Sequence, residues 1–295
     1  MTKLSPNTIG IIAMLFSSMG FIFNDALIKL AAEQLPQGEA IFLRGAFGIT
    51  FMTLAAWYTG ALANMRQVIR PSVGLRVLGE TVATVFYLAA LFRSPIAVNT
   101  AILQVLPLLV TAGSAIFLHE VVGWRRWTAI AVGFCGVLLI VRPGLEGFTI
   151  WSLSALLGVF FMALRDLSTR RIPAHVPTFS VALASITGTT LAIGALMKPF
   201  EVWIMPDLVT LAYLAGAALF ILVGFVSVII AMRTGEISVV APFRYSIVLW
   251  AILLGIVIWG EYPDPATLAG ITIIIGTGIY TFVRERKARA QAARG

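Results

Sequence analysis

The sequence is poor in the residue types on which most enzymes, metal centres and disulfide-bonded domains depend. Its 295 residues include one cysteine, Cys135, and two histidines, His119 and His175. One cysteine cannot close an intrachain disulfide, and two histidines are too few for a cluster of metal ligands. Nor does the chain contain the Gly-x-x-x-x-Gly-Lys-Ser/Thr loop that binds nucleoside triphosphates. We therefore expect no metal, no cofactor and no catalytic residues.

Charged residues are scarce as well. They make up 12% of the chain, against about 25% in ordinary soluble proteins. Hydrophobic residues make up 59%, and the mean hydropathy is +0.97. A transmembrane helix needs about 20 apolar residues, so this length accommodates roughly ten spans with short connections and no separate soluble domain. The composition predicts an all-α integral membrane protein.

Breaks in the apolar runs at glycine, proline and charge clusters predict ten transmembrane helices. Their ranges are 8–32, 37–58, 73–92, 96–118, 126–142, 149–168, 178–198, 207–232, 237–259 and 266–283. The first range is expected to be a retained helix and not a secretory signal, because it continues past 20 residues and lacks a small-residue cleavage pattern.

Lysine and arginine are distributed unevenly among the predicted loops. If the N-terminus is inside, the inner segments hold thirteen of these residues and the outer segments hold four. Cytoplasmic loops carry such an excess, so both termini of this multi-pass chain are expected to face the cytoplasm of a bacterial inner (plasma) membrane. Membrane topology and contact with anionic membrane lipid then account for the net charge of +8, and no nucleic-acid partner is expected.

The two halves of the chain resemble each other at an offset of 141 residues. The aligned pairs are Asp25 with Asp166, Lys29 with Arg170, Pro36 with Pro177, Ile96 with Ile237, Val98 with Val239, and Glu120 with Glu261. General similarity between apolar helices explains the aliphatic pairs but not the acidic and proline pairs. We interpret residues 1–147 and 148–295 as two copies of a five-helix unit. Because five is odd, the second copy enters the membrane from the other face, which makes the repeat inverted.

Several motifs resemble the drug/metabolite transporter superfamily, in its EamA-type branch. They are the Gly-rich helix at 266–283, the turns Phe117-Leu-His-Glu120 and Trp259-Gly-Glu261, the segment from Ala101-Ile-Leu-Gln-Val-Leu-Pro107 to Gly133-Phe-Cys-Gly136, and Arg142-Pro-Gly144. The resemblance covers essentially the whole chain. It implies a ten-helix secondary transporter that works by alternating access, with a central cavity between two four-helix groups and the fifth and tenth helices peripheral.

Two features of the sequence depart from the pattern of the family. His119 stands where a glycine is more usual before the glutamate, and Asn24, Asp25 and Lys29 lie in a first helix that is mostly neutral in many relatives. These three polar residues are candidates for an external gate, or Asp25 and Lys29 form a local pair at the i, i+4 spacing.

Ionisable groups at membrane depth are the strongest candidates for function, because each costs about 2.5–3.5 kcal/mol in the hydrocarbon unless it is paired or hydrated. Glu80 either pairs with Arg76 one turn earlier or faces a cavity, where it would bind a cation or carry a coupling proton. Arg165 and Asp166 are placed in the last turn of the helix at 149–168, where water is close.

Two arginines can likewise be interpreted either as structural residues or as substrate-binding residues. Arg244, next to Tyr245, either forms an ion pair between helices, with Glu80 as a candidate partner, or clamps a carboxylate or phosphate of the substrate. Arg44 lies about 10 Å below the outer surface and either binds substrate or only snorkels or pairs with Glu39.

The remaining candidates are polar or aromatic. Asn99 and Gln104 share a helical stripe that either faces a cavity or joins helices, and Tyr87 is among the aromatic residues near the expected cavity level. Pro107 and Pro242 interrupt hydrogen bonding in their helices and permit bends. The predicted substrate-binding residues are Glu80, Arg244, Tyr245, Gln104, Arg44, Tyr87 and Asn99.

The sequence thus predicts a secondary transporter that moves a small organic metabolite without ATP. Arginine, glutamate, amides and aromatics suit a zwitterion or an aromatic heterocycle, such as an amino acid, a vitamin or a nucleoside-like solute. One alternative is a substrate-selective channel lined by Arg44 and Arg244. Another is a lipid-modifying membrane enzyme, which would need a cluster of ionisable groups near one interface. The glycines at 133–136, 270, 276 and 278 predict close helix contacts, within the protomer or in a homodimer.

Overall fold

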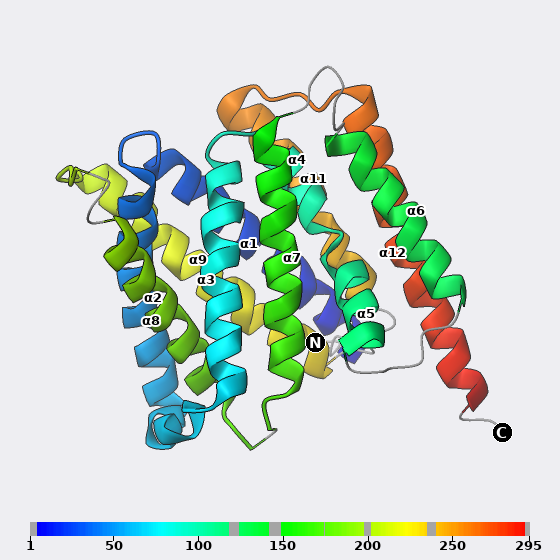
Figure 1. Cartoon of the computed structure of the whole chain (residues 1–295), viewed down its shortest axis with the longest axis horizontal. Helices are drawn as coiled ribbons and strands as arrows, with labels where there is room; N and C mark the ends of the chain where they lie inside the picture. The colour runs from blue at the N-terminus through cyan, green and yellow to red at the C-terminus, as the bar shows by residue number, and fades with distance from the viewer. Residues whose placement is uncertain are drawn as a thin grey trace. The chain divides into compact units, whose positions relative to one another are not determined.

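The computed structural model describes residues 5–117, 124–141, 149–173, 175–197, 202–234 and 240–292, and all regular structure in these ranges is helical (Figure 1). Several predicted features lie outside the described residues: the turn with His119 and Glu120, the segment Arg142-Pro-Gly144, the boundary at 147/148, and Ile237 and Val239.

The observed helices follow the predicted ranges to within a few residues, apart from two interruptions and the last helix, which ends nine residues beyond its predicted end at 283. In the first half they are α1 (Pro6–Ala31), α2 (Gln37–Tyr58), the 3₁₀ helix η1 (Ala61–Val68), α3 (Pro71–Leu91), α4 (Ile96–Leu103), α5 (Leu106–Phe117) and α6 (Trp124–Val141). In the second half they are α7 (Ile150–Arg170), α8 (Thr178–Met197), α9 (Leu208–Thr234), the 3₁₀ helix η2 (Ala241–Tyr245), α11 (Ser246–Leu254), the π-helical η3 (Gly255–Trp259) and α12 (Pro265–Ala292).

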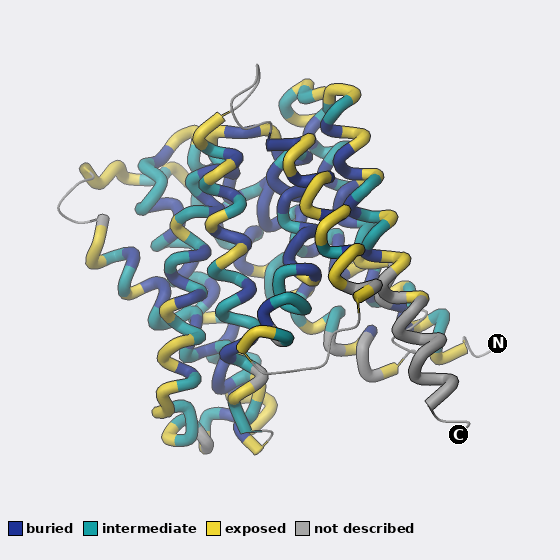
Figure 2. Tube along the Cα trace, turned by 45° about the vertical axis from the view of Figure 1, so that its right-hand side comes forward, coloured by how far each residue is buried: buried dark blue, intermediate teal, exposed yellow. Residues whose placement is uncertain are grey.

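Seven helical spans in the described ranges, one of them α4 and α5 taken together, are long and apolar enough to cross a membrane, and three shorter apolar helices accompany them. Large apolar side chains are exposed on faces of the helices, among them Leu54, Trp57, Phe160 and Leu191. Figure 2 marks the exposed positions of the chain in yellow. Such faces suit contact with lipid and not with water. The chain is a multi-pass membrane protein.

Two helices predicted as continuous are interrupted in the structure. The range 96–118 is divided between α4 and α5, and the range 237–259 contains 3₁₀, α and π segments. Pro107 explains the first break, because its ring clashes with the carbonyl of Leu103, which is the last residue of α4. Pro242 lies in η2, which is the 3₁₀ segment of the second range. The prolines were predicted only to interrupt hydrogen bonding and permit bends within continuous helices; the structure divides the first range near Pro107 and has Pro242 in a 3₁₀ segment.

Aspartates set the start of two helices. The amide of Thr210 donates to Oδ1 of Asp207 at 2.8 Å, and the amide of Thr267 donates to Oδ1 of Asp264 at 2.7 Å. These are N-cap bonds, which satisfy amides that the first turn of a helix leaves without a partner. The bonds from Thr210 also hold the pKa of the Asp207 carboxyl below its usual range.

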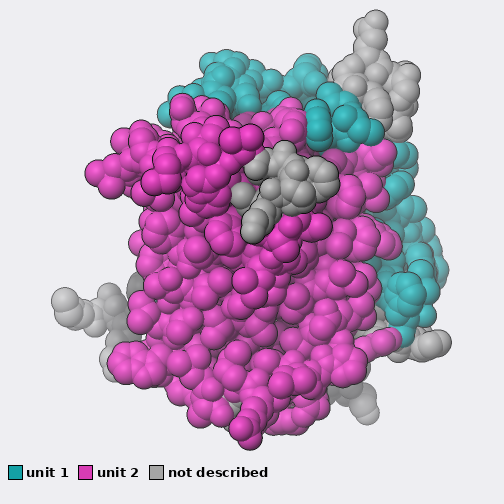
Figure 3. Space-filling view, turned by 60° about the vertical axis from the view of Figure 1, so that its left-hand side comes forward, with its two compact units in different colours: residues 1–22, 95–152, 223–295 teal, residues 23–94, 153–222 magenta. Residues whose placement is uncertain are grey.

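The chain forms two compact units, each built from both halves of the sequence (Figure 3). Unit 1 comprises residues 1–22, 95–152 and 223–295, and unit 2 comprises residues 23–94 and 153–222. In unit 2, α8 packs against both α2 and α3. Small residues permit this packing, since a Cβ on Gly45 would lie 2.1 Å from the Thr190 hydroxyl and one on Gly188 would lie 2.5 Å from Val77.

In unit 1, α6 and α12 lie side by side (Figure 1). Their backbones approach closely, because a Cβ on Gly270 would lie 2.6 Å from the carbonyl oxygen of Gly136. The close contact predicted for these two glycines is confirmed. Gly276 differs, since a Cβ there would meet no atom within 4 Å.

This difference gives a matched test of the contact. Gly270→Ala is expected to lower the free energy of unfolding by about 1 kcal/mol or more, because the neighbouring backbone would have to move. Gly276→Ala, on the same helix, should leave stability unchanged or slightly raised, since alanine favours helix. Thermal unfolding of the purified protein in detergent measures both. Equal midpoints for the two variants would contradict the close contact.

The end of η3 is tied to the start of α4, both in unit 1. Gly260 has a φ of 66°, which is the left-handed conformation that glycine adopts most easily. It is followed by Glu261, whose Oε2 accepts a hydrogen bond from the amide of Ile96 at 2.9 Å. The motif Trp259-Gly-Glu261 therefore places a carboxylate at the N-terminus of a second helix, where negative charge is stabilised.

Candidate functional site

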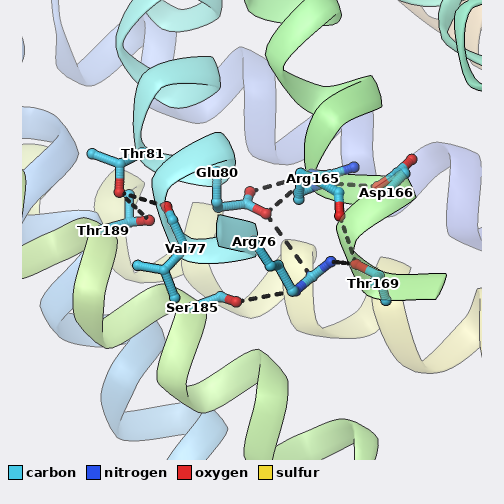
Figure 4. Close-up of polar contacts among 9 residues, drawn as sticks. All are labelled: Arg76, Val77, Glu80, Thr81, Arg165, Asp166, Thr169, Ser185 and Thr189. Atoms are coloured by element: carbon cyan, nitrogen blue, oxygen red, sulfur yellow. Dashed lines mark hydrogen bonds and ion pairs between the residues drawn. The ribbon is translucent and has the colours of Figure 1, made fainter. Parts of the chain in front are cut away.

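A network of charged side chains surrounds Glu80 in unit 2 (Figure 4). Nη1 of Arg165 lies 3.3 Å and 3.2 Å from the two carboxylate oxygens of Glu80, and Nη2 of Arg76 lies 3.9 Å from one of them. Nε of Arg165 donates to Asp166 at 2.8 Å. The predicted Arg76–Glu80 pair is present, but Arg165 is the closer partner. The placement of Arg165 in the last turn of its helix is wrong, because the helix continues five residues further, to Arg170.

Two glycines bring the helices of this network together. A Cβ on Gly79 of α3 would lie 3.1 Å from the backbone nitrogen of Arg165, and one on Gly158 of α7 would lie 2.8 Å from the backbone nitrogen of Tyr87. The hydroxyl of Ser154 also donates to the carbonyl of Phe86 at 2.8 Å. Since α3 and α7 approach so closely, Glu80 and Arg165 meet. The glycine beside Glu80 was the sequence signal for this contact.

Hydroxyl groups complete the network on the side of Arg76. Its Nε donates to Ser185 at 3.1 Å, and its Nη1 donates to Thr169 (Figure 4). The four charged side chains, Arg76, Glu80, Arg165 and Asp166, sum to zero charge. Each of them is thus compensated within unit 2, which is the arrangement of a structural ion-pair network.

A second polar cluster lies where α1, α2 and α3 meet in unit 2. Nδ2 of Asn24 donates to Oδ1 of Asp25 at 2.9 Å, and the hydroxyl of Tyr87 donates to Oδ2 of Asp25 at 3.1 Å. Nη1 of Arg44 donates to Oδ1 of Asn24 at 3.2 Å. Asn24, Asp25 and Tyr87 are buried, and Arg44 is partly exposed. The structure therefore brings two predicted site residues, Arg44 and Tyr87, around Asn24 and Asp25.

Both local pairs predicted for this region are wrong. Arg44 bonds to Asn24 and not to Glu39, whose Oε2 accepts the amide of Ile204 at 2.9 Å. Asp25 bonds to Asn24 and Tyr87, while Nζ of Lys29 donates to the carbonyl of Ser94 at 2.8 Å. An exposed i, i+4 pair contributes only about 0.2–0.5 kcal/mol, so other hydrogen bonds, most of them to segments distant in the chain, prevail.

The other predicted site residues belong to unit 1. The side-chain amides of Asn99 and Gln104 are buried and donate within their own helical segment, to the carbonyls of Pro95 and Thr100, each at 3.2 Å. The hydroxyl of Tyr245 occupies the space that a Cβ on Gly278 would fill. Arg244 is exposed, and its backbone carbonyl lies 3.4 Å from the hydroxyl of Ser18.

Comparison with known proteins identifies the family. The model of the EamA-like transporter family matches the chain twice, at residues 8–142 and 149–283. An S-adenosylmethionine uptake transporter of Rickettsia bellii is 27% identical over 98% of both chains. A pseudopaline exporter of Pseudomonas aeruginosa is 26% identical over 90% of this chain and 93% of its own length. A riboflavin transporter of Vibrio cholerae is 25% identical over 90% of both.

A solved crystal structure supports the fold alone. It superposes with a TM-score of 0.62 at 21% identity and covers 95% of this chain and 97% of its own. The family match extends over most of the sequence, and the relatives are named as transporters of small organic molecules and not as enzymes. The chain belongs to the EamA-like transporter family and is a membrane transporter.

Proposed function

We propose that the chain is a secondary transporter that moves a small organic metabolite across a bacterial inner membrane by alternating access. The observation that carries the proposal is the match of one transporter family model to both halves of the chain. The solutes named for relatives, S-adenosylmethionine and riboflavin, agree with the expected amino-acid, nucleoside-like and vitamin classes.

The proposed architecture has ten transmembrane helices in two inverted five-helix repeats, residues 1–147 and 148–295, with both termini in the cytoplasm. The excess of lysine and arginine in the predicted inner segments supports this orientation. The interrupted segments support the repeat, because α4–α5 and η2–α11–η3 occupy corresponding places in the two halves. Interrupted helices in corresponding positions are typical of the substrate sites of such transporters. We accordingly keep Asn99, Gln104, Arg244 and Tyr245 as candidate substrate-binding residues.

Glu80 is better explained as a structural residue than as a proton carrier. Two arginines compensate its charge, and Arg165 contacts both of its oxygens. We propose that substrate contacts in unit 2 come from the cluster around Asp25 and Arg44, whose hydrogen-bonding capacity is less completely used.

Counterflow in proteoliposomes tests the transport mechanism. Vesicles loaded with unlabelled S-adenosylmethionine or riboflavin should accumulate the same labelled solute transiently, without ATP, and uptake should saturate. Alternating access predicts that unlabelled solute inside the vesicles accelerates the uptake of labelled solute, because the carrier returns to the outward-facing state faster with solute bound than empty. Protein-free vesicles are the control. Non-saturating flux without acceleration would instead support a channel, and no flux of either solute would contradict transport of both solute types.

A further inference from the structure

The cluster of Asn24, Asp25, Arg44 and Tyr87 contains hydrogen-bonding capacity that the protein does not use. A carboxylate has about four acceptor sites, and Asp25 receives two bonds, from Asn24 and Tyr87. A guanidinium has five N–H donors, and within the described part of the chain Arg44 donates one bond, to Asn24. Asp25 therefore has unused acceptor sites and Arg44 has unused donors, and both side chains are bonded to Asn24.

Asn24 holds the two opposite charges apart. Its amide nitrogen donates to Asp25, and its amide oxygen accepts from Arg44, so one side chain is bonded to both. The charges of Asp25 and Arg44 act on each other. Even so, among the described residues neither side chain has an ion-pair partner within 4.0 Å. The cluster is a separated cation and anion, with an amide as the spacer.

The two charges lie at the same depth. Asp25 lies six residues before the end of α1, and Arg44 lies seven residues after the start of α2. At 1.5 Å per residue, each is about 9–10 Å from the turn that joins these helices. Tyr87 is near the end of α3, which places its hydroxyl in the same layer.

The charged side chains around Glu80, also in unit 2, are arranged differently. There, Arg165 contacts Glu80 and Asp166 directly, and hydroxyls take donors of Arg76. Both networks are made of α3 and neighbouring helices, but only the cluster around Asn24 keeps its opposite charges out of contact. Charges at this depth require compensation. A bound solute would provide it at Asp25 and Arg44.

We propose that this cluster binds the α-amino-acid group of the transported solute. Arg44 receives the carboxylate through its guanidinium fork, and Asp25 receives the ammonium group. An α-amino-acid group carries an ammonium and a carboxylate on one carbon, and these two charges sum to zero, which matches the separated pair. The inference rests on the proposed transport function and narrows its substrate class. It favours S-adenosylmethionine, which has an α-amino-acid group, over riboflavin, which has none.

Binding of three related compounds to the purified protein tests each half of the site. The probes are S-adenosylmethionine, its decarboxylated form, and 5′-deoxy-5′-dimethylsulfonioadenosine, which keeps the sulfonium charge and lacks the whole amino-acid group. Each loss of a charged group should weaken binding about tenfold or more, because a polar group of the site loses its partner. In Arg44→Gln, S-adenosylmethionine and its decarboxylated form should bind equally. In Asp25→Asn, the decarboxylated form should bind no better than 5′-deoxy-5′-dimethylsulfonioadenosine.

Two exposed residues provide matched controls. Arg70→Gln removes an arginine from the surface of unit 2, and Asp207→Asn removes a charge while keeping a residue that caps helices well. Both should preserve the wild-type order of the three probes. Absence of S-adenosylmethionine binding, or binding that both site variants retain, would overturn the inference. If riboflavin nevertheless shows counterflow, the proposed transport function stands while this site assignment fails; if neither solute does, both fail.

Discussion

Replacement of Arg165 by alanine is expected to produce the largest loss of stability among single changes in unit 2. The variant leaves Glu80 and Asp166 without the guanidinium that contacts both of them. Removing one member of a fully buried ion pair costs about 3–5 kcal/mol, and we expect the lower end, about 3 kcal/mol, because the side chains of Arg165 and Glu80 are 21% and 26% exposed. Arg76 compensates only in part, since its nearest nitrogen lies 3.9 Å from Glu80. Thermal unfolding in detergent, followed by tryptophan fluorescence, measures the loss.

A second change identifies the cause of that loss. Glu80→Gln in the Arg165→Ala background should recover part of the stability, because it removes the charge left without a partner. Glu80→Gln alone should destabilise, since Arg165 and Arg76 then lose a carboxylate. Arg70→Ala, an exposed arginine in the same unit, is the control. The network is not structural if Arg165→Ala unfolds at the same temperature as Arg70→Ala, or if the double variant shows no recovery.

Most of the helices could be predicted from the sequence, because the residues that determine where a helix begins and ends lie within or beside it. Continuous apolar runs predicted the membrane segments, and a single proline predicted disrupted hydrogen bonding near the place where α4 ends at Leu103. Pro107 removes a backbone donor and clashes with the carbonyl four residues earlier, and neither effect depends on tertiary structure. The same reasoning located Gly136 and Gly270 as contact points, because small residues are needed wherever two helix backbones approach.

The polar contacts were less predictable, because they join residues that are distant in the chain. Glu80 and Arg165 are 85 positions apart, and Asp25 and Tyr87 are 62 apart. Sequence spacing suggests only partners on the same helix, such as Lys29 for Asp25. The actual partners depend on which helices approach each other and at what height. Gly79, beside Glu80, marked such an approach, but nothing in the sequence identified α7 as the helix that it meets.

Glu261 has a role that the sequence motif alone did not reveal. It belongs to the turn Trp259-Gly-Glu261, yet its carboxylate acts on α4, which begins 165 positions earlier at Ile96. Glu39 makes the same kind of bond to the amide of Ile204, also at 2.9 Å. Each carboxylate thus fixes a segment distant in the chain by accepting a backbone amide. For Glu261 the segment is the helix that carries Asn99 and Gln104.

Glu261→Ala is therefore expected to destabilise the protein by about 2 kcal/mol, because a hydrogen bond to a charged group contributes about 1.5–3 kcal/mol and the helix N-terminus favours negative charge. Glu261→Gln should lose less, since its amide oxygen still accepts the bond from Ile96. Glu33→Ala removes an exposed glutamate from another loop and serves as the control. Thermal unfolding should rank the midpoints as control, glutamine variant, alanine variant. A midpoint for Glu261→Ala equal to that of Glu33→Ala would show that the bond to α4 does not stabilise the fold.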